Sequence, residues 1–106
     1  MTSLSTHVLD TTTGTPAAGV GLVLTAEDGR VLTSALTDED GRARLADSLL
    51  PGTYRLTFAT GEFFAAAGTE VFYPEAVVAF VVRPERDHLH VPLLLSPFAY
   101  STYRGS

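Results

Sequence analysis

Two histidines, His88 and His90, stand two residues apart near the end of the chain. Side chains at positions i and i+2 of a β-strand point to the same face, so this spacing presents two imidazoles side by side. Such a pair suits metal binding, since imidazole is a common transition-metal ligand, or acid–base chemistry near neutral pH. The simpler interpretation is a surface or capping histidine beside the Arg86–Asp87 turn, and spacing alone favours it.

The third histidine, His7, lies far away in the sequence, so only the fold could bring it to that pair. Three histidines on a zinc ion would leave an open position for water. No further metal-site spacing accompanies them. The carboxylate run Asp38–Asp40 before Gly41 resembles part of a calcium loop, but the distal glutamate of that loop is missing. We interpret this run as a solvated hairpin turn.

The C-terminal segment, residues 101–106, carries Tyr103 and Arg104. An arginine there could clamp an anion through two parallel hydrogen bonds, although a frayed terminus is the simpler interpretation. Arg42, directly after the acidic turn, is ambiguous by itself. The chain contains neither a Gly-x-Ser-x-Gly nucleophile elbow nor a glycine-rich phosphate loop. The residues alone therefore favour histidine and arginine chemistry over serine or phosphate chemistry.

Composition excludes several classes of protein. The 106 residues allow one small domain, 1–106, with little room for a deep pocket in one subunit. The chain has no cysteine or lysine, which excludes thiolate and Schiff-base chemistry. Its net charge of −5 argues against nucleic acid and anionic membranes as partners. The N-terminal residues show neither a basic nor an apolar stretch, so we expect no secretory signal and a cytoplasmic protein.

The elements that must position these groups are mostly strands, because apolar and polar residues alternate between turn residues. The expected strands are Leu4–Asp10, Val20–Ala26, Arg30–Thr37, Ala43–Leu45, Thr53–Ala59, Val77–Arg83, His88–Leu95 and Tyr100–Tyr103. Thr11–Ala18 is expected to be a turn, and Asp28–Gly29 a hairpin. Thr60–Gly68 predicts a short helix, with Thr60 as a possible cap and Gly68 as the stop. The pattern predicts an all-β sandwich.

Several segments, spread from end to end of the chain, match one family. They are Ser5–Asp10 with Gly14-x-Pro-Ala17, Thr37–Arg42, Pro51-Gly-x-Tyr54, Phe72–Glu75, His88–Pro97 and the terminal Tyr100–Ser106. In these segments the chain resembles the 5-hydroxyisourate hydrolases, transthyretin-like enzymes of urate breakdown. The terminal Tyr-Arg-Gly-Ser is highly specific to the enzyme branch. The sequence departs mildly from the family at Leu89 and at Phe98–Ala99.

The resemblance implies a transthyretin-like sandwich of two sheets and eight strands with one short helix. It implies a homotetramer, a dimer of dimers, with active sites between the dimers. The implied reaction opens the lactam ring of 5-hydroxyisourate to 2-oxo-4-hydroxy-4-carboxy-5-ureidoimidazoline, without a cofactor or a metal. A site between subunits would also explain how so small a domain could enclose a substrate without a deep pocket of its own.

The family motifs place two groups of site residues on this chain. The expected catalytic residues are His7, Arg42 and His90. The expected substrate-binding residues are His88, Tyr103, Arg104, Gly105 and Ser106. Our hypothesis is that one neutral histidine, His7 or His90, deprotonates water while the other orients it or protonates the leaving nitrogen. An arginine would stabilise the oxyanion.

Three other functions compete with this hypothesis. The first is a small-molecule carrier, because transthyretin shares the fold; the histidines and the terminal Tyr-Arg-Gly-Ser argue against it. The second is a metal-dependent hydrolase that uses His7, His88 and His90. The third is a structural interaction domain without a site. Decay of freshly made 5-hydroxyisourate would separate the enzyme from the carrier and the structural domain, and metal analysis would test the metal enzyme.

Overall fold

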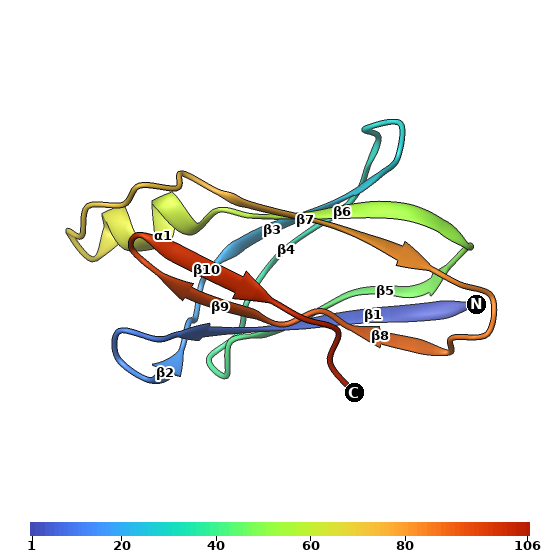
Figure 1. Ribbon diagram of the computed structural model, residues 1–106, viewed down its shortest axis with the longest axis horizontal. Helices are drawn as coiled ribbons and strands as arrows, with labels where there is room; N and C mark the ends of the chain where they lie inside the picture. The colour runs from blue at the N-terminus through green and yellow to red at the C-terminus, as the bar shows by residue number, and fades with distance from the viewer.

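The computed structural model describes residues 1–106, which form two β-sheets packed face to face and one short helix (Figure 1). The first sheet contains β1 (Thr2–Asp10), β2 (Thr15–Pro16), β5 (Arg42–Leu49), β8 (His88–His90), β9 (Leu93–Ser96) and β10 (Ala99–Thr102). The second sheet contains β3 (Gly21–Ala26), β4 (Val31–Leu36), β6 (Gly52–Phe58) and β7 (Ala76–Val82). The predicted two-sheet sandwich with one short helix is confirmed.

Strand β1 is the centre of the first sheet. Its first half pairs antiparallel with β5 and parallel with β8, and its second half pairs with β2 and β9. Buried and half-buried residues alternate strictly along it, as the period of two requires for a strand with one face on the core. Its outer face therefore carries Ser3, Ser5 and His7.

The core fills the space between the inner faces of the two sheets. Eighteen buried apolar residues form one cluster. The largest fully buried side chains include Phe58 and Leu56 of β6, Leu24 of β3 and Leu93 of β9. Burying a side chain of this size stabilises the fold by roughly 1.5–3 kcal/mol. This packing makes the sandwich a firm support for the residues on its outer faces.

The acidic segment before β5 is a tight turn that sets the position of Arg42. One oxygen of the Asp38 carboxylate accepts hydrogen bonds from the backbone N–H groups of Asp40 and Arg42, both at 2.9 Å. Gly41 has a φ of +74°, and a Cβ there would lie 2.5 Å from the carbonyl oxygen of Val8. The predicted polar turn is confirmed, but it joins β4 of the second sheet to β5 of the first and is therefore not a hairpin. Only glycine fits this approach to β1.

The strands differ from the predicted ranges in three places. The expected strand His88–Leu95 is interrupted between β8 and β9, where Pro92 offers no N–H to a neighbouring strand. The expected turn Thr11–Ala18 contains the two-residue strand β2, which pairs with the end of β1. Strand β5 runs well past Leu45. The first two of these differences turn the predicted eight strands into ten.

The helix α1 (Thr60–Ala66) begins at the predicted residue but without the predicted cap. Ala59 occupies the N-cap position and no side chain caps it, so the prediction that Thr60 caps the helix is wrong. Gly68 has a φ of +71° and its N–H donates to the Ala65 carbonyl, which confirms the predicted glycine stop. No helix of the chain is long and apolar enough to cross a membrane.

Candidate active site

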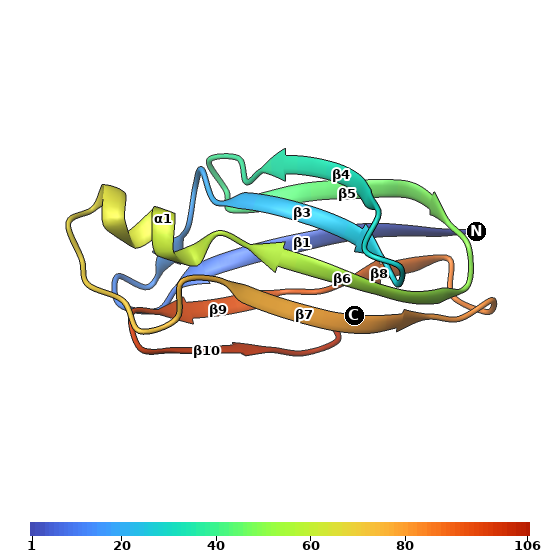
Figure 2. The ribbon, with the colours of Figure 1, turned by 90° about the horizontal axis from the view of Figure 1, so that it is seen from above.

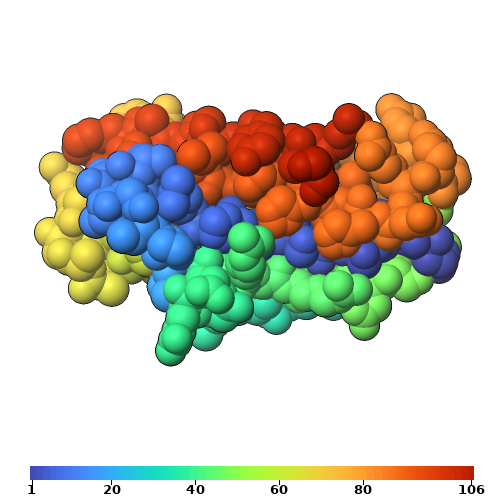
Figure 3. Space-filling model, turned by 90° about the horizontal axis from the view of Figure 1, so that it is seen from below, coloured from blue at the N-terminus to red at the C-terminus, as the bar shows by residue number.

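Three adjacent strands, β5, β1 and β8, bring four of the eight predicted site residues onto one outer face of the first sheet. In the β1–β5 register His7 lies opposite Arg42, and in the β1–β8 register Ser5 lies opposite His90 and Ser3 opposite His88. Figure 3 looks onto this side of the molecule, where blue β1, green β5 and orange β8 lie beside the dark red C-terminal residues.

His90 is the most strongly influenced titratable group of this face. It is half-buried, and burial lowers its pKa from the ordinary value of 6.5. The positive charge of Arg42 lowers that pKa further, followed by His7 and His88. A lowered pKa keeps this imidazole neutral at neutral pH, which is the state that can accept a proton.

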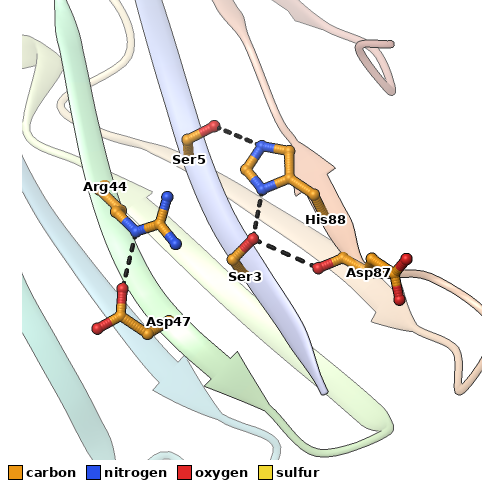
Figure 4. Close-up of polar contacts among 6 residues, drawn as sticks. All are labelled: Ser3, Ser5, Arg44, Asp47, Asp87 and His88. Carbon is orange, nitrogen blue, oxygen red and sulfur yellow. Dashed lines mark hydrogen bonds and ion pairs between the residues drawn. The ribbon is translucent and has the colours of Figure 1, made fainter.

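His88 is exposed and lies in a ladder of hydrogen bonds with two serines of β1 (Figure 4). Its Nδ1 lies 2.5 Å from the Ser3 hydroxyl oxygen and its Nε2 lies 3.0 Å from the Ser5 hydroxyl oxygen. The Ser5 oxygen also lies 2.9 Å from Nδ1 of His90. One serine hydroxyl therefore connects the two histidines of the His-x-His pair.

Arg42 and Arg44 project from the same face of β5 but differ in their partners. The Nε of Arg44 lies 2.8 Å from the Asp47 carboxylate, and Figure 4 shows this pair on the other side of β1 from His88. Arg42 makes no ion pair, and it lines an open hollow beside Ser5. Its charge is therefore available to a bound anion.

The C-terminal tail passes directly over His90. The N–H of Gly105 donates to the carbonyl oxygen of His90 at 2.8 Å. A Cβ at residue 105 would lie 2.7 Å from Cδ2 of the His90 ring, closer than real carbon atoms approach. Glycine is thus required at this position for the tail to rest against the histidine.

The remaining tail residues are placed elsewhere. Tyr103 and Arg104 line a mostly apolar hollow of about 320 Å³ with residues of β7 and with Leu89 and Val91, whose side chains belong to the core side of the sheet. Ser106 is exposed at the end of the chain. Within one chain, the structure brings together His7, Arg42, His88, His90 and Gly105, whereas Arg104 lines the hollow beside β7.

The histidines share a face without forming a ligand set. No group of three or more His, Cys, Asp or Glu side chains in the chain is placed to hold a metal ion. Asp38, from the sequence that resembles part of a calcium loop, has one carboxylate oxygen occupied by backbone N–H groups. The face presents neutral and cationic groups, which can exchange a proton and bind an anion.

Sequence reasoning missed Ser3 and Ser5 as members of this site. The available signal was the pairing of two patterns of period two, Ser3-x-Ser5 in β1 and His88-x-His90 in β8. The signal becomes usable only once these two strands are known to be parallel neighbours, which the sequence does not show.

Comparisons with known proteins identify one family that this chain resembles. The model of the HIUase/Transthyretin family matches residues 4–105. The 5-hydroxyisourate hydrolase of Caulobacter vibrioides is 48% identical over 115 aligned residues, which cover 100% of both chains.

Solved structures with the same fold superpose closely on this chain. The Klebsiella pneumoniae 5-hydroxyisourate hydrolase superposes with a TM-score of 0.92 at 45% identity, covering 100% of this chain and 94% of that one. Sea bream transthyretin, solved in complex with thyroxine, superposes with a TM-score of 0.89 at 32% identity, covering 96% of this chain and 93% of that one.

Proposed function

The chain belongs to the HIUase/transthyretin family, and on that premise we propose that it hydrolyses the lactam of 5-hydroxyisourate. The product is 2-oxo-4-hydroxy-4-carboxy-5-ureidoimidazoline. Curated relatives named for this activity match the chain over its full length. The sequence comparison thus supports the reaction, and the geometry of the outer face supports the residues that perform it.

One observation carries this function: His7, Arg42 and His90 come from three neighbouring strands and lie close together on one face. In the strand registers His7 lies opposite Arg42, and His90 lies opposite Ser5, two residues before His7 on the same face of β1. Burial lowers the pKa of His90, and the charges of Arg42 and His7 lower it further. A half-buried neutral base beside a free guanidinium is a combination suited to water activation next to a polar, electron-poor heterocycle. Transport of an apolar ligand requires neither group.

The reaction needs an activated water. A neutral histidine takes a proton from water as the water oxygen bonds to the lactam carbonyl carbon. The C=O electron pair moves onto its oxygen, which gives a tetrahedral oxyanion. The oxyanion then collapses, the ring C–N bond breaks, and the leaving nitrogen receives a proton from a histidinium. The proton count is balanced, because the proton taken from water returns to the product.

Arg42 stabilises the negative charge that develops on the carbonyl oxygen. A guanidinium forms short, charge-assisted hydrogen bonds with oxyanions, and it keeps its charge at all working pH values. Arg42 is suited to this task because no carboxylate of the chain pairs with it, unlike Arg44. Of the two histidines, one is the base and the other orients the water or protonates the leaving nitrogen.

We further propose that the working protein is a homotetramer. Strand β7 is an edge strand of the second sheet and β10 is an edge strand of the first, and the two lie along the same side of the sandwich (Figure 2). The unpaired backbone N–H and C=O groups of an edge strand can form hydrogen bonds with a strand of another chain. The outward side chains of β7 are apolar, with Val77 44% and Val81 49% exposed, and Tyr103 beyond β10 is also exposed. A second copy paired along these edges would cover this apolar surface.

The histidine face remains open after such edge pairing, because it lies on the outer surface of β5, β1 and β8. We propose that two dimers meet across this face, so that the substrate is enclosed between them. Enclosure excludes water and strengthens the electrostatic contribution of Arg42. Arg104 and Ser106 would then serve substrate through the assembly rather than through contacts within their own chain.

Ultraviolet decay of freshly made 5-hydroxyisourate tests the function. We expect decay to accelerate in proportion to protein concentration and to lose that acceleration in the His90→Ala variant. Decay at the uncatalysed rate would favour the carrier or the structural domain instead. We also propose a cytoplasmic location for the protein, which cell fractionation would test.

A further inference from the structure

An unbroken series of hydrogen bonds runs along the outer face from His90 to a backbone carbonyl. It passes from Nδ1 of His90 to the Ser5 hydroxyl at 2.9 Å, and from Ser5 to Nε2 of His88 at 3.0 Å. It continues from Nδ1 of His88 to the Ser3 hydroxyl at 2.5 Å and ends at the Asp87 carbonyl oxygen at 3.4 Å. Figure 4 shows the part of this series from Ser5 to Asp87.

The direction of the series depends on the Ser3 hydroxyl, whose oxygen lies 2.5 Å from Nδ1 of His88 and 3.4 Å from the Asp87 carbonyl oxygen. A carbonyl oxygen only accepts, so we assign the single Ser3 proton to Asp87. The Ser3 oxygen must then accept from Nδ1 of His88, which therefore carries a proton. In a neutral imidazole only one ring nitrogen is protonated, so Nε2 of His88 holds a lone pair.

The same argument continues to His90. The Nε2 lone pair of His88 accepts the single proton of the Ser5 hydroxyl. The Ser5 oxygen therefore accepts from Nδ1 of His90, and that nitrogen carries the ring proton. The Nε2 atom of neutral His90 is left with its lone pair, and no hydrogen bond within the chain engages it.

We infer that Ser5 is a positioning residue, whose hydroxyl holds His90 in the tautomer with a free Nε2 lone pair and thereby makes His90 the base. The tautomer of His90 is argued from the hydrogen bonds. Only the role of His90 as the catalytic base rests on the proposed function. The Cδ2 atom, which is bonded to Nε2, lies under Gly105. The free lone pair is therefore on the side of the ring nearest the C-terminal tail.

The series also gives the charge of the accepted proton a place to rest. When Nε2 of His90 takes a proton from water, the Nδ1 proton of His90 can move to Ser5 as the Ser5 proton moves to Nε2 of His88. His90 is then neutral with its proton on Nε2, and the positive charge rests on exposed His88. When Nε2 gives its proton to the leaving nitrogen, the same two transfers run in reverse, which restores Nδ1–H on His90 and delivers the proton taken from water to the product. His88 would then contribute to proton transfer more than to substrate binding.

The charged and titratable groups near His90 do not supply a competing partner for Nδ1. Arg42 on β5 and His7 on β1 lie within electrostatic range, as does His88 on β8. Arg44, opposite Ser5, is paired with Asp47. None of these side chains hydrogen-bonds either ring nitrogen of His90, so Ser5 is the one side chain that does so.

The direct test is the tautomer of His90 in the intact wild-type protein. Histidine labelled with ¹⁵N in the ring and long-range ¹H–¹⁵N correlation spectra at neutral pH show which nitrogen is protonated. We expect Nδ1–H for both His90 and His88. Protonation of His90 at Nε2 instead would overturn the inference. This spectrum requires no variant and no substrate.

Variants of Ser5 provide the second test. Ser5→Ala is expected to lower kcat by about ten- to a hundredfold with little change in KM, the range for residues that orient a functional histidine. It should also replace the single His90 tautomer by a mixture. Ser5→Thr keeps the hydroxyl and suits a strand, so it should restore both readouts. Ser34→Ala, an exposed serine of β4 in the other sheet, is the matched control and should change neither.

The outcomes separate the two proposals. An active protein whose His90 is protonated at Nε2, or whose Ser5→Ala variant keeps both kcat and the Nδ1–H tautomer, contradicts the role of Ser5 and leaves the proposed function intact. A protein without catalysed decay contradicts the proposed function, while the spectrum still reports the tautomer. If Ser5→Ala does not fold, the wild-type spectrum decides.

Discussion

Gly105 rests on the ring of His90. The backbone N–H of Gly105 donates to the His90 carbonyl oxygen at 2.8 Å, and no space remains between its Cα and the imidazole for a side chain. The last residues of the chain are thus held against the base that we assign to the reaction. The contact connects the terminal Tyr-Arg-Gly-Ser to the histidine face by geometry.

Gly105→Ala tests this contact. The added methyl group would lie 2.7 Å from Cδ2 of His90, so the tail must move or the ring must turn. We expect kcat/KM to fall at least about tenfold. We expect the melting temperature to change little, because Arg104 and Ser106 on either side are exposed.

Gly21→Ala is the control for that substitution. A Cβ at Gly21 would make an ordinary contact of 3.5 Å with the Ala59 side chain, far from the histidines. It should keep both activity and stability. An unchanged kcat/KM in Gly105→Ala would show that the tail has no part in positioning His90.

Alanine substitutions of His7, His90 and Arg42 test the catalytic assignments. Each should lower kcat/KM by at least about a hundredfold, the lower end of what general acid–base catalysis contributes. Arg44→Ala is the matched control for Arg42→Ala, because Arg44 lies two residues along the same strand face but is paired with Asp47. Near-normal turnover in any of the three variants, with assembly retained, would remove that residue from the mechanism.

The pKa of His90 should depend on the charge of Arg42. Burial and then this positive charge lower the pKa of His90 below 6.5, so protonation of the wild-type residue occurs at a pH below that value. Arg42→Gln removes the charge, and the pKa should rise. The pH titration of the His90 ring resonances measures the midpoint without relying on activity.

Arg44→Gln is the control for the titration. The Arg44 charge is neutralised by Asp47 and is not among the causes that lower the pKa of His90. Its variant should therefore keep the wild-type midpoint. A midpoint in Arg42→Gln that is equal to or lower than the wild-type value would contradict the electrostatic coupling of these two residues.

Substitutions on the apolar surface of β7 test the proposed assembly. Carboxylates in place of Val77 and Val81 would be buried and unpaired at an interface along this edge, which costs several kcal/mol. We expect the double aspartate variant to weaken assembly at least about a hundredfold in sedimentation velocity experiments. Val31→Asp, on exposed β4 at the opposite edge of the same sheet, should leave assembly unchanged. Equal behaviour of both variants would place the interface elsewhere.

Residue patterns specified most of the fold. The strict alternation of β1 and the turn glycines Gly29 and Gly41 are local signals, and all three appear in the structure as predicted. The interruption of the strand His88–Leu95 at Pro92 also has a local signal, because proline has no N–H to donate to a neighbouring strand. The missing cap on α1 had no such signal, because Thr60 is a good cap residue that here lies one position inside the helix.

The site was predictable as a set of residues but not as a geometry. Family motifs named His7, Arg42 and His90, whereas the parallel pairing of β1 with β8 that brings them together is a long-range property of the fold. The hydroxyl of Ser5 acquires its role only through that pairing. For Arg104 the motif is clear from the sequence, but its place in one chain, in an apolar hollow beside β7, is not.

The decay of 5-hydroxyisourate in a buffer containing a metal chelator tests the central claim most directly. Wild-type protein should accelerate the decay in proportion to its concentration, and His90→Ala at equal concentration should lose at least about 99% of that acceleration. If wild-type protein leaves the decay at its uncatalysed rate, or if His90→Ala accelerates it as well as the wild type does, the assignment of His90 as the base of a 5-hydroxyisourate hydrolase is contradicted.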